Sequence, residues 1–219
     1  MIIGIEGHSF TGKTTTLDAI RGNSAVTVIP ETDHYAGGID QYPPFPPLDQ
    51  DMSRTNVDFF ANLERARKAD ADAADGDIVT DRTFVSVLLF QKFLRQLDNE
   101  WVDALDYGKS LYHDRIDADE VIIPDMMTVL TCASDAEYMS RSGREVSVGE
   151  LRTLDAYRFF TDEYLRIFEP YQKLGRLAVL INSNSTSPEM LADNVVDVGA
   201  DELTSSQKIT LAHEVVEGI

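Results

Sequence analysis

Five short runs of apolar residues recur along the chain, and a stretch with helical periodicity follows each of them. The runs cover residues 2–6, 25–29, 77–80, 126–131 and 177–181. Strands this short and this continuously apolar are typical of a parallel sheet that is covered on both faces. The pattern predicts a three-layer α/β fold in which five mainly parallel strands alternate with helices.

The segments between these runs have the periodicity and the end residues of helices. Ser134 with Glu137, and Ser147 with Glu150, form S-x-x-E capping boxes, which predict two helix starts. Further helices are expected at residues 13–21, 55–74, 84–97, 100–112 and 188–196.

Two segments are less regular. Residues 33–51 contain two adjacent glycines and four prolines, so we expect a long loop of the kind that binds a ligand or acts as a lid. The tail, residues 201–219, is typical either of a short helix against the body or of an oligomer contact such as a homodimer interface. The absence of a linker or repeat predicts a single domain over residues 1–219.

The turn after the first apolar run carries a phosphate-binding motif, because residues 7–14 match G-x-x-x-x-G-K-[ST]. Backbone amides of such a loop point at a phosphate, and the next helix directs its positive end at the same place. A chain of this length holds the pattern by chance about once in a hundred. We therefore expect a P-loop that binds ATP with Mg²⁺. The expected nucleotide-binding residues are Gly7, His8, Ser9, Phe10, Thr11, Gly12, Lys13, Thr14, Thr15 and Asn182.

Several of these residues have a role that follows from their chemistry. Lys13 would bridge the β- and γ-phosphates, and the Thr14 hydroxyl would ligate Mg²⁺. Asp81 follows the third run and would hold the metal through water, whereas the alternative is a helix cap. Arg82 can grip a phosphate or an acceptor hydroxyl. His8 is expected to be exposed near the phosphates.

Ligands of parallel sheets collect at the carboxyl ends of the strands. The residues that follow the five runs are therefore expected to converge on one cleft, near Gly7, Glu31, Asp81, Thr131 and Asn182. From this position Glu31 could orient or deprotonate an acceptor hydroxyl. The alternative for Glu31 is an ordinary loop carboxylate.

Two arginines lie near Gly143, in a region of about residues 134–150 that would form a helical lid. Arg141 and Arg144 suit a lid that neutralises charge on transferring phosphates. The alternative is that basic side chains favour a helix C-terminus. On the helix expected at 55–74, Phe60 and Glu64 share a face. Phe60 fills the core or stacks on a base, and Glu64, which interrupts an apolar stripe, is expected to contact the substrate.

The composition narrows the class of protein. The chain has 38 acidic and 19 basic residues and a formal net charge of −19, so phosphate repulsion argues against general nucleic-acid binding. No apolar run is long enough to cross a membrane. With a single cysteine, Cys132, and no visible signal peptide, a cytoplasmic protein is expected.

With these residues placed, the chain resembles the thymidylate kinase and deoxynucleoside kinase superfamily. Residues 81–91, DRTFVSVLLFQ, are similar to the D-R-Y-x-x-S-x-x-A-Y-Q segment of thymidylate kinases. Asp81, Arg82, Ser86 and Gln91 match in register, whereas Thr83 replaces the tyrosine. The resemblance implies that Arg82 and Ser86 bind the substrate.

The dipeptide Pro30-Glu31 instead resembles deoxynucleoside kinases, whose glutamate after the second strand is the general base on the sugar hydroxyl. Thymidylate kinases carry an arginine where Pro30 stands. The resemblance implies an ATP-dependent kinase of a nucleoside or of a nucleoside monophosphate. Because Pro30 replaces that arginine, a neutral hydroxyl acceptor is favoured. The implied catalytic residues are Lys13, Glu31, Arg82, Arg141 and Arg144.

Other P-loop functions remain as alternatives. The first is a kinase of another small metabolite, such as an antibiotic or a sugar-like acceptor. The second is a regulatory NTPase that transfers to water. The sequence has no N-K-x-D segment of a guanine-specific switch and no apolar strand that ends in Asp-Glu, as in motor ATPases. The third, a phosphate-binding module without turnover, is disfavoured because metal and lid residues are both present.

Overall fold

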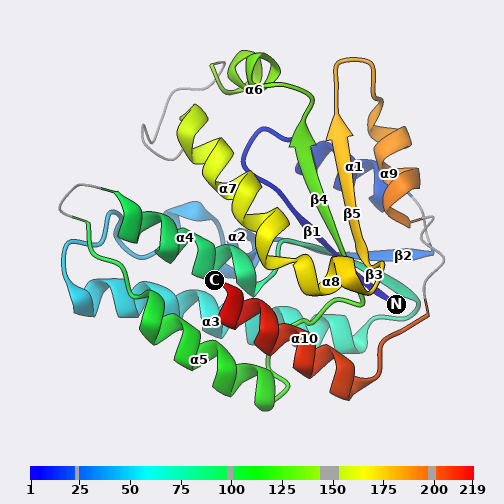
Figure 1. Cartoon of the computed structure of the whole chain (residues 1–219). Coiled ribbons are helices and arrows are strands. Elements are labelled where there is room, and N and C mark those ends of the chain that lie inside the picture. The colour runs from blue at the N-terminus through cyan, green and yellow to red at the C-terminus, as the bar shows by residue number, and fades with distance from the viewer. Residues whose placement is uncertain (23–24, 98–100, 144–152, 197–200) are drawn as a thin grey trace.

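The structure is a computed structural model of the 219-residue chain, and it describes residues 1–22, 25–97, 101–143, 153–196 and 201–219. A single sheet runs through the molecule, with helices packed on both of its faces (Figure 1). Its five strands are β1 Ile2–Glu6, β2 Val26–Ile29, β3 Asp77–Asp81, β4 Met126–Cys132 and β5 Leu177–Asn182.

The strands lie in the order β2-β3-β1-β4-β5, and all four neighbouring pairs are parallel. This confirms the predicted parallel sheet and its strands to within one residue at each end. In the register, Ile5 is opposite Asp81, and Cys132 is opposite Asn182. The carboxyl ends of the strands therefore meet along one edge of the sheet.

Helices cover both faces because alternate side chains of each strand point to opposite sides. On one face, Ile3 and Ile5 pack against Leu17 of α1 and Val195 of α9. The other face is covered by a larger cluster that includes Val129 and residues of α4, α5, α7 and α10. The helices are α1 Lys13–Arg21, α2 Thr32–Ala36, α3 Gln50–Ala73, α4 Phe84–Gln96, α5 Leu105–Asp117, α6 Asp135–Ser142, α7 Leu154–Ile167, α8 Glu169–Lys173, α9 Pro188–Val196 and α10 Ser205–Gly218.

The prediction that residues 33–51 form a long loop is wrong in part. This segment contains most of α2, a 3-10 turn η1 Ile39–Gln41, and the start of α3. Helix α3 begins earlier than expected because the Asp49 side chain accepts a hydrogen bond from the amide of Met52 at 2.7 Å. The helix expected at 100–112 is α5, and it is displaced toward the C-terminus.

The two predicted capping boxes had different outcomes. Ser134 does cap α6, since its side chain accepts a hydrogen bond from the amide of Glu137 at 3.2 Å. The predicted helix start at Ser147 and Glu150 lies outside the described residues. Helix α7 has Thr153 as its N-cap residue, whose side chain accepts a hydrogen bond from the amide of Ala156.

The C-terminal tail forms α10, which packs against α5, α7 and α8 (Figure 1). Its apolar face is buried, with Leu211, Val215 and Val216 in the large core cluster. Asp125, which is fully buried, accepts hydrogen bonds from the amides of Ile2 and Leu203 at 2.7 Å. Of the two interpretations of the tail, a helix against the body is confirmed. Within the part of the chain that the structure describes, no helix is long and apolar enough to cross a membrane.

Candidate active site

The P-loop, residues 7–14, joins β1 to α1, and two of its glycines are required by backbone angle and by space. Gly7 has φ 146° and Gly12 has φ 100°, which side-chain-bearing residues rarely adopt. A Cβ atom on Gly12 would lie 2.1 Å from Nδ2 of Asn182, and one on Gly7 would lie 2.5 Å from the carbonyl oxygen of Leu130. The loop is therefore packed closely against the ends of β4 and β5.

Lys13 begins α1, and its ammonium group is folded into the loop. Nζ donates hydrogen bonds to the carbonyl oxygens of Gly7 at 2.8 Å and His8 at 3.3 Å. Burial, followed by the positive charge of Arg82, lowers the pKa of Lys13 to about 8, although nearby carboxylates such as Glu31 oppose the shift. A triphosphate in the loop would add negative charge and favour the protonated lysine.

The expectation that His8 is exposed is wrong, because its side chain is only 6% exposed. The ring stacks on Phe160 of α7 with centroids 5.2 Å apart, and its Nδ1 lies 3.2 Å from the hydroxyl of Tyr138 in α6. Phe10, at φ 67°, contacts the Tyr138 ring edge-on. These aromatic contacts hold the loop, so a nucleotide would meet the backbone of His8.

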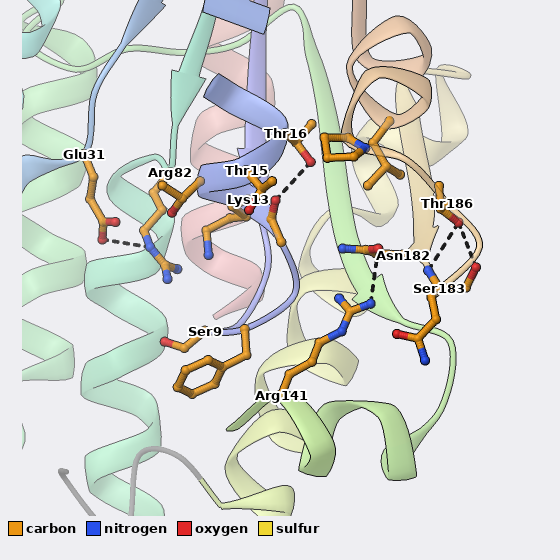
Figure 2. Close-up of a pocket in the computed structure, with 16 residues that line it drawn as sticks. Ser9, Lys13, Thr15, Thr16, Glu31, Arg82, Arg141, Asn182, Ser183 and Thr186 are labelled. Carbon is orange, nitrogen blue, oxygen red and sulfur yellow. Dashed lines mark hydrogen bonds and ion pairs between the residues drawn. The ribbon is translucent and has the colours of Figure 1, made fainter. Parts of the chain in front are cut away.

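A cleft of about 670 Å³ opens beside the P-loop, and Figure 2 shows side chains from both sides pointing into it. Ten of the residues predicted from the sequence line it: Ser9, Phe10, Gly12, Lys13, Thr14, Thr15, Glu31, Arg82, Arg141 and Asn182. The convergence expected at the strand ends is thus present for β1, β2, β3 and β5. Thr131 is buried within β4 and lines neither of the two cavities described.

Asn182, the last residue of β5, joins the P-loop to α6, the helix predicted to belong to a lid. Its Nδ2 donates a hydrogen bond to the carbonyl oxygen of Thr11 at 2.8 Å, and its Oδ1 accepts one from Arg141 at 3.3 Å. Arg141 also pairs with Glu137 one turn earlier in α6, at 2.8 Å. The predicted lid arginine Arg141 therefore reaches the cleft, whereas Arg144 lies outside the described residues.

At the other end of the cleft, Glu31 and Arg82 form an ion pair with Nε and Oε1 2.8 Å apart (Figure 2). Arg82 Nη1 also donates to the carbonyl oxygen of Gly7 at 3.2 Å and to Ser86 Oγ at 3.3 Å. Burial raises the pKa of Glu31, but the charges of Arg82 and Lys13 outweigh it and hold the pKa below its ordinary value. The Glu31 carboxylate is therefore ionised at neutral pH.

Glu6 is a member of the site that the sequence analysis did not single out. It is fully buried, and it accepts hydrogen bonds from the Thr83 amide and hydroxyl at 2.8 and 2.7 Å and from the Ser86 hydroxyl at 2.7 Å. Burial outweighs these donors and raises the pKa of Glu6. Through Ser86, whose hydroxyl is 2.9 Å from that of Tyr164, it orders the surroundings of Arg82. The sequence does carry one signal for Glu6, because it is a carboxylate at the end of an otherwise apolar, buried strand.

Asp81 and Thr14 lie together along a second cavity of about 460 Å³ beside the P-loop. Oδ1 of Asp81 is buried and has no hydrogen-bond partner among the described residues. Burial, and then the charge of Glu31, raises the pKa of Asp81. Thr14 is an exposed residue, and its hydroxyl and an unpartnered carboxylate oxygen are the kinds of donor that Mg²⁺ prefers. The residues present therefore fit the expected metal.

Three predicted substrate-binding residues line neither cavity: Phe60, Glu64 and Ser86. Glu64 is 1% exposed and pairs with Arg67 of the same helix at 2.6 Å. Phe60 is half-buried and meets Tyr42 edge-on, with ring centroids 5.0 Å apart. The Ser86 hydroxyl accepts a hydrogen bond from Arg82 Nη1 at 3.3 Å.

The chain was compared with known proteins by sequence and by structure. Neither a family model nor a curated protein matches the sequence. Among solved structures, deoxyadenosine kinase from M. mycoides, with dCMP and dCDP bound, superposes with a TM-score of 0.56 at 16% identity, over 90% of this chain and 97% of that chain. The same enzyme with bound dATP gives 0.59 at 15% identity, over 90% and 98%.

Thymidylate kinase from Candida albicans superposes with a TM-score of 0.63 at 15% identity, over 88% of each chain. These matches show that the chain has the P-loop kinase fold of nucleoside and nucleotide kinases. The fold that the resemblance implied is thereby confirmed along most of the chain.

Proposed function

We propose that the protein is an ATP-dependent, Mg²⁺-requiring kinase that transfers the γ-phosphoryl group to a hydroxyl of a nucleoside. The observation that carries this proposal is the Glu31–Arg82 ion pair, which opens onto the same cleft as Lys13. A carboxylate, a phosphate-binding lysine and a lid arginine around one space are what in-line phosphoryl transfer needs. The kinases of the same fold support the assignment to this class.

The donor half of the site would hold the triphosphate. The P-loop amides and Lys13 would bind the β- and γ-phosphates, and Arg141 would approach them from α6. Thr14 and Asp81 would hold Mg²⁺, whose charge offsets that on the phosphate oxygens. Ser183 and Asn184 line the cleft beyond Asn182. They would present an uncharged polar surface to the nucleobase of the donor.

The acceptor half favours a neutral hydroxyl over a phosphate. Of the described residues, three cations line the cleft, and each already has an oxygen partner: Lys13, Arg82 and Arg141. A monophosphate at this end would face the ionised Glu31, and Pro30 stands where an arginine could have compensated. For a hydroxyl acceptor the same carboxylate is favourable, because it can accept the proton that the hydroxyl must lose.

In the proposed reaction, Glu31 accepts the proton of the acceptor hydroxyl while the hydroxyl oxygen forms a bond to the γ-phosphorus. The bond from that phosphorus to the β–γ bridging oxygen breaks, and ADP leaves with the electron pair. Arg82 orients both Glu31 and the acceptor. The products are ADP, a phosphate monoester and a protonated Glu31, which returns its proton to water.

The test is a panel of nucleosides, nucleoside monophosphates and small alcohols, with acceptor-dependent ADP release as the measurement. We expect turnover with at least one nucleoside. Turnover only with monophosphates would assign the nucleotide branch, and equal turnover with and without every acceptor would favour an NTPase.

A substitution of Glu31 tests its proposed role as the general base in the chemical step. Glu31→Gln should lower kcat by about 10²-fold or more while the acceptor KM changes little, because the base acts as the proton leaves. A Glu31→Gln variant that turns over and binds a monophosphate more tightly would overturn the choice of acceptor.

A further inference from the structure

Arg67 is a guanidinium in the interior of the protein, 1% exposed, that contacts the two chain segments carrying Glu31 and Arg82. It lies on α3, outside the lining of either cavity. Its nitrogens donate to Glu64 Oε1 at 2.6 Å, Thr80 Oγ1 at 2.6 Å, and the carbonyl oxygens of Pro30 at 3.0 Å, Asp81 at 2.7 Å and Arg82 at 2.9 Å.

These contacts tie the end of β2 to the end of β3. The Pro30 carbonyl belongs to the peptide that leads into Glu31, and Nε of Arg67 holds it. On the other side, one nitrogen, Nη2, holds the carbonyl oxygens of both Asp81 and Arg82. A planar fork fixes the direction of each bond, which a flexible ammonium could not do.

The backbone at Arg82 requires such support. Its φ is 61°, in the left-handed region that residues with side chains rarely occupy. Strained backbone persists only where the surroundings fix it. Here the Arg82 amide donates to Ile5 at 2.9 Å, while its carbonyl accepts from Arg67 and from Thr80 Oγ1. In this conformation the Arg82 side chain pairs with Glu31.

We propose that Arg67 is a positioning residue that sets the Glu31–Arg82 pair for phosphoryl transfer. It touches neither the donor nor the acceptor and acts through the two backbone segments it holds. This inference rests on the proposed function for its kinetic consequence. Its structural consequence, the separation of Nε and Oε1 in the pair, does not depend on any activity.

The experiment uses Arg67→Lys, which keeps a positive charge beside Glu64 and removes the fork. We expect kcat to fall at least about tenfold with the donor KM within about twofold, because small misplacements of reacting groups are costly in rate. In a crystal structure of the variant, the distance between Arg82 Nε and Glu31 Oε1 should lengthen by about 1 Å or more.

Lys208→Met is the matched control. It disturbs a cation that pairs with a fully buried carboxylate, Asp125, but at the amino-terminal end of the sheet. Lys208→Met should lower the unfolding temperature and leave kcat unchanged. If it lowers kcat as much as Arg67→Lys does, the effect is one of general stability and the proposal fails.

A second variant guards against misfolding of Arg67→Lys. Thr80→Val is close in shape and removes the hydroxyl that bonds both Arg67 and the Arg82 carbonyl. It should lower kcat at least about threefold. Unchanged kcat together with an unchanged Glu31–Arg82 separation overturns the proposal. A wild type without acceptor-dependent turnover contradicts the proposed function alone, and the crystallographic separation then decides the role of Arg67.

Discussion

Lys13 is the residue whose charge the proposed reaction depends on most. Lys13→Ala should fold but lose at least about 10²-fold in kcat, because the ammonium acts mainly on charge that develops in the transition state. Since burial lowers the pKa of Lys13 to about 8, kcat/KM for the donor should fall as pH rises through about 8.

The control is Lys13→Arg, which stays charged at all accessible pH values and should lack this alkaline limb. The measurement is a pH series of ADP release with thermal unfolding curves for each variant. Activity of Lys13→Ala within a few-fold of wild type would remove Lys13 from the donor site.

Asp81 provides a separate prediction about the metal. Its buried Oδ1 lacks a partner among the described residues, so Asp81→Asn should raise the Mg²⁺ concentration for half-maximal activity and lower kcat. A Mg²⁺ titration of both proteins measures this. Superimposable titration curves would leave Asp81 without a role in holding the metal.

At this scale the sequence predicted residues whose roles follow from local motifs. Gly7, Gly12 and Lys13 lie as the P-loop pattern requires. The prediction from sequence failed for His8, because Phe160, the residue that stacks on its ring, lies far along the chain in α7. Arg67 was not predicted as a site residue, because no sequence pattern indicates that its partners are backbone carbonyls of two distant segments.

Among the elements, α6 carries a prediction of its own. Arg141 extends from α6 and is held by Glu137 and Asn182 at the edge of the cleft. Arg141→Ala should lower kcat more than it weakens donor binding, because a lid cation interacts most strongly as charge moves onto the transferring group. Steady-state kinetics and equilibrium titration with a non-hydrolysable donor separate the two effects.

The matched control for α6 is Arg158→Ala, on α7, where an exposed arginine pairs with Asp135 outside the cleft. Its kcat should equal that of the wild type. If Arg141→Ala leaves both donor affinity and turnover unchanged, Arg141 is an ordinary helix-end residue.

Strands were predicted more accurately than loops and helix ends. Buried parallel strands are marked by continuous apolar runs, so β1 was predicted at its observed bounds. The region 33–51 was taken as irregular because proline and glycine dominate it. Yet α2 forms there, with Glu31 as N-cap residue and Gly37, at φ 82°, ending it. One turn of helix has too little periodicity to be detected in a sequence.

On the scale of the whole molecule, α10 completes the large core cluster without reaching the cleft. Leu211→Ala should cost about 2–4 kcal/mol of the free energy of unfolding, because it leaves a cavity between α10 and the neighbouring helices. For a chain of this size that is a fall in Tm of roughly 4–16 °C. Calorimetry measures it, and kcat below the transition should be unchanged.

Glu214→Ala, on the exposed face of the same helix, is the control and should shift Tm by about 2 °C or less. Equal shifts for the two variants would mean that α10 is not part of the cooperative core.

The order of the strands has a consequence for synthesis on the ribosome. β1 leaves the ribosome before the other four strands, yet in the sheet it lies between β3 and β4. The P-loop likewise precedes Asn182, whose side-chain amide holds the carbonyl oxygen of Thr11 and which follows 171 residues later. At about 5–20 residues per second, this gap lasts roughly 10–35 s. During this interval the nascent chain carries the predicted phosphate-binding motif without the contact from Asn182. If the proposed function holds, a nucleotide should gain its complete binding site only after β5 has left the ribosome.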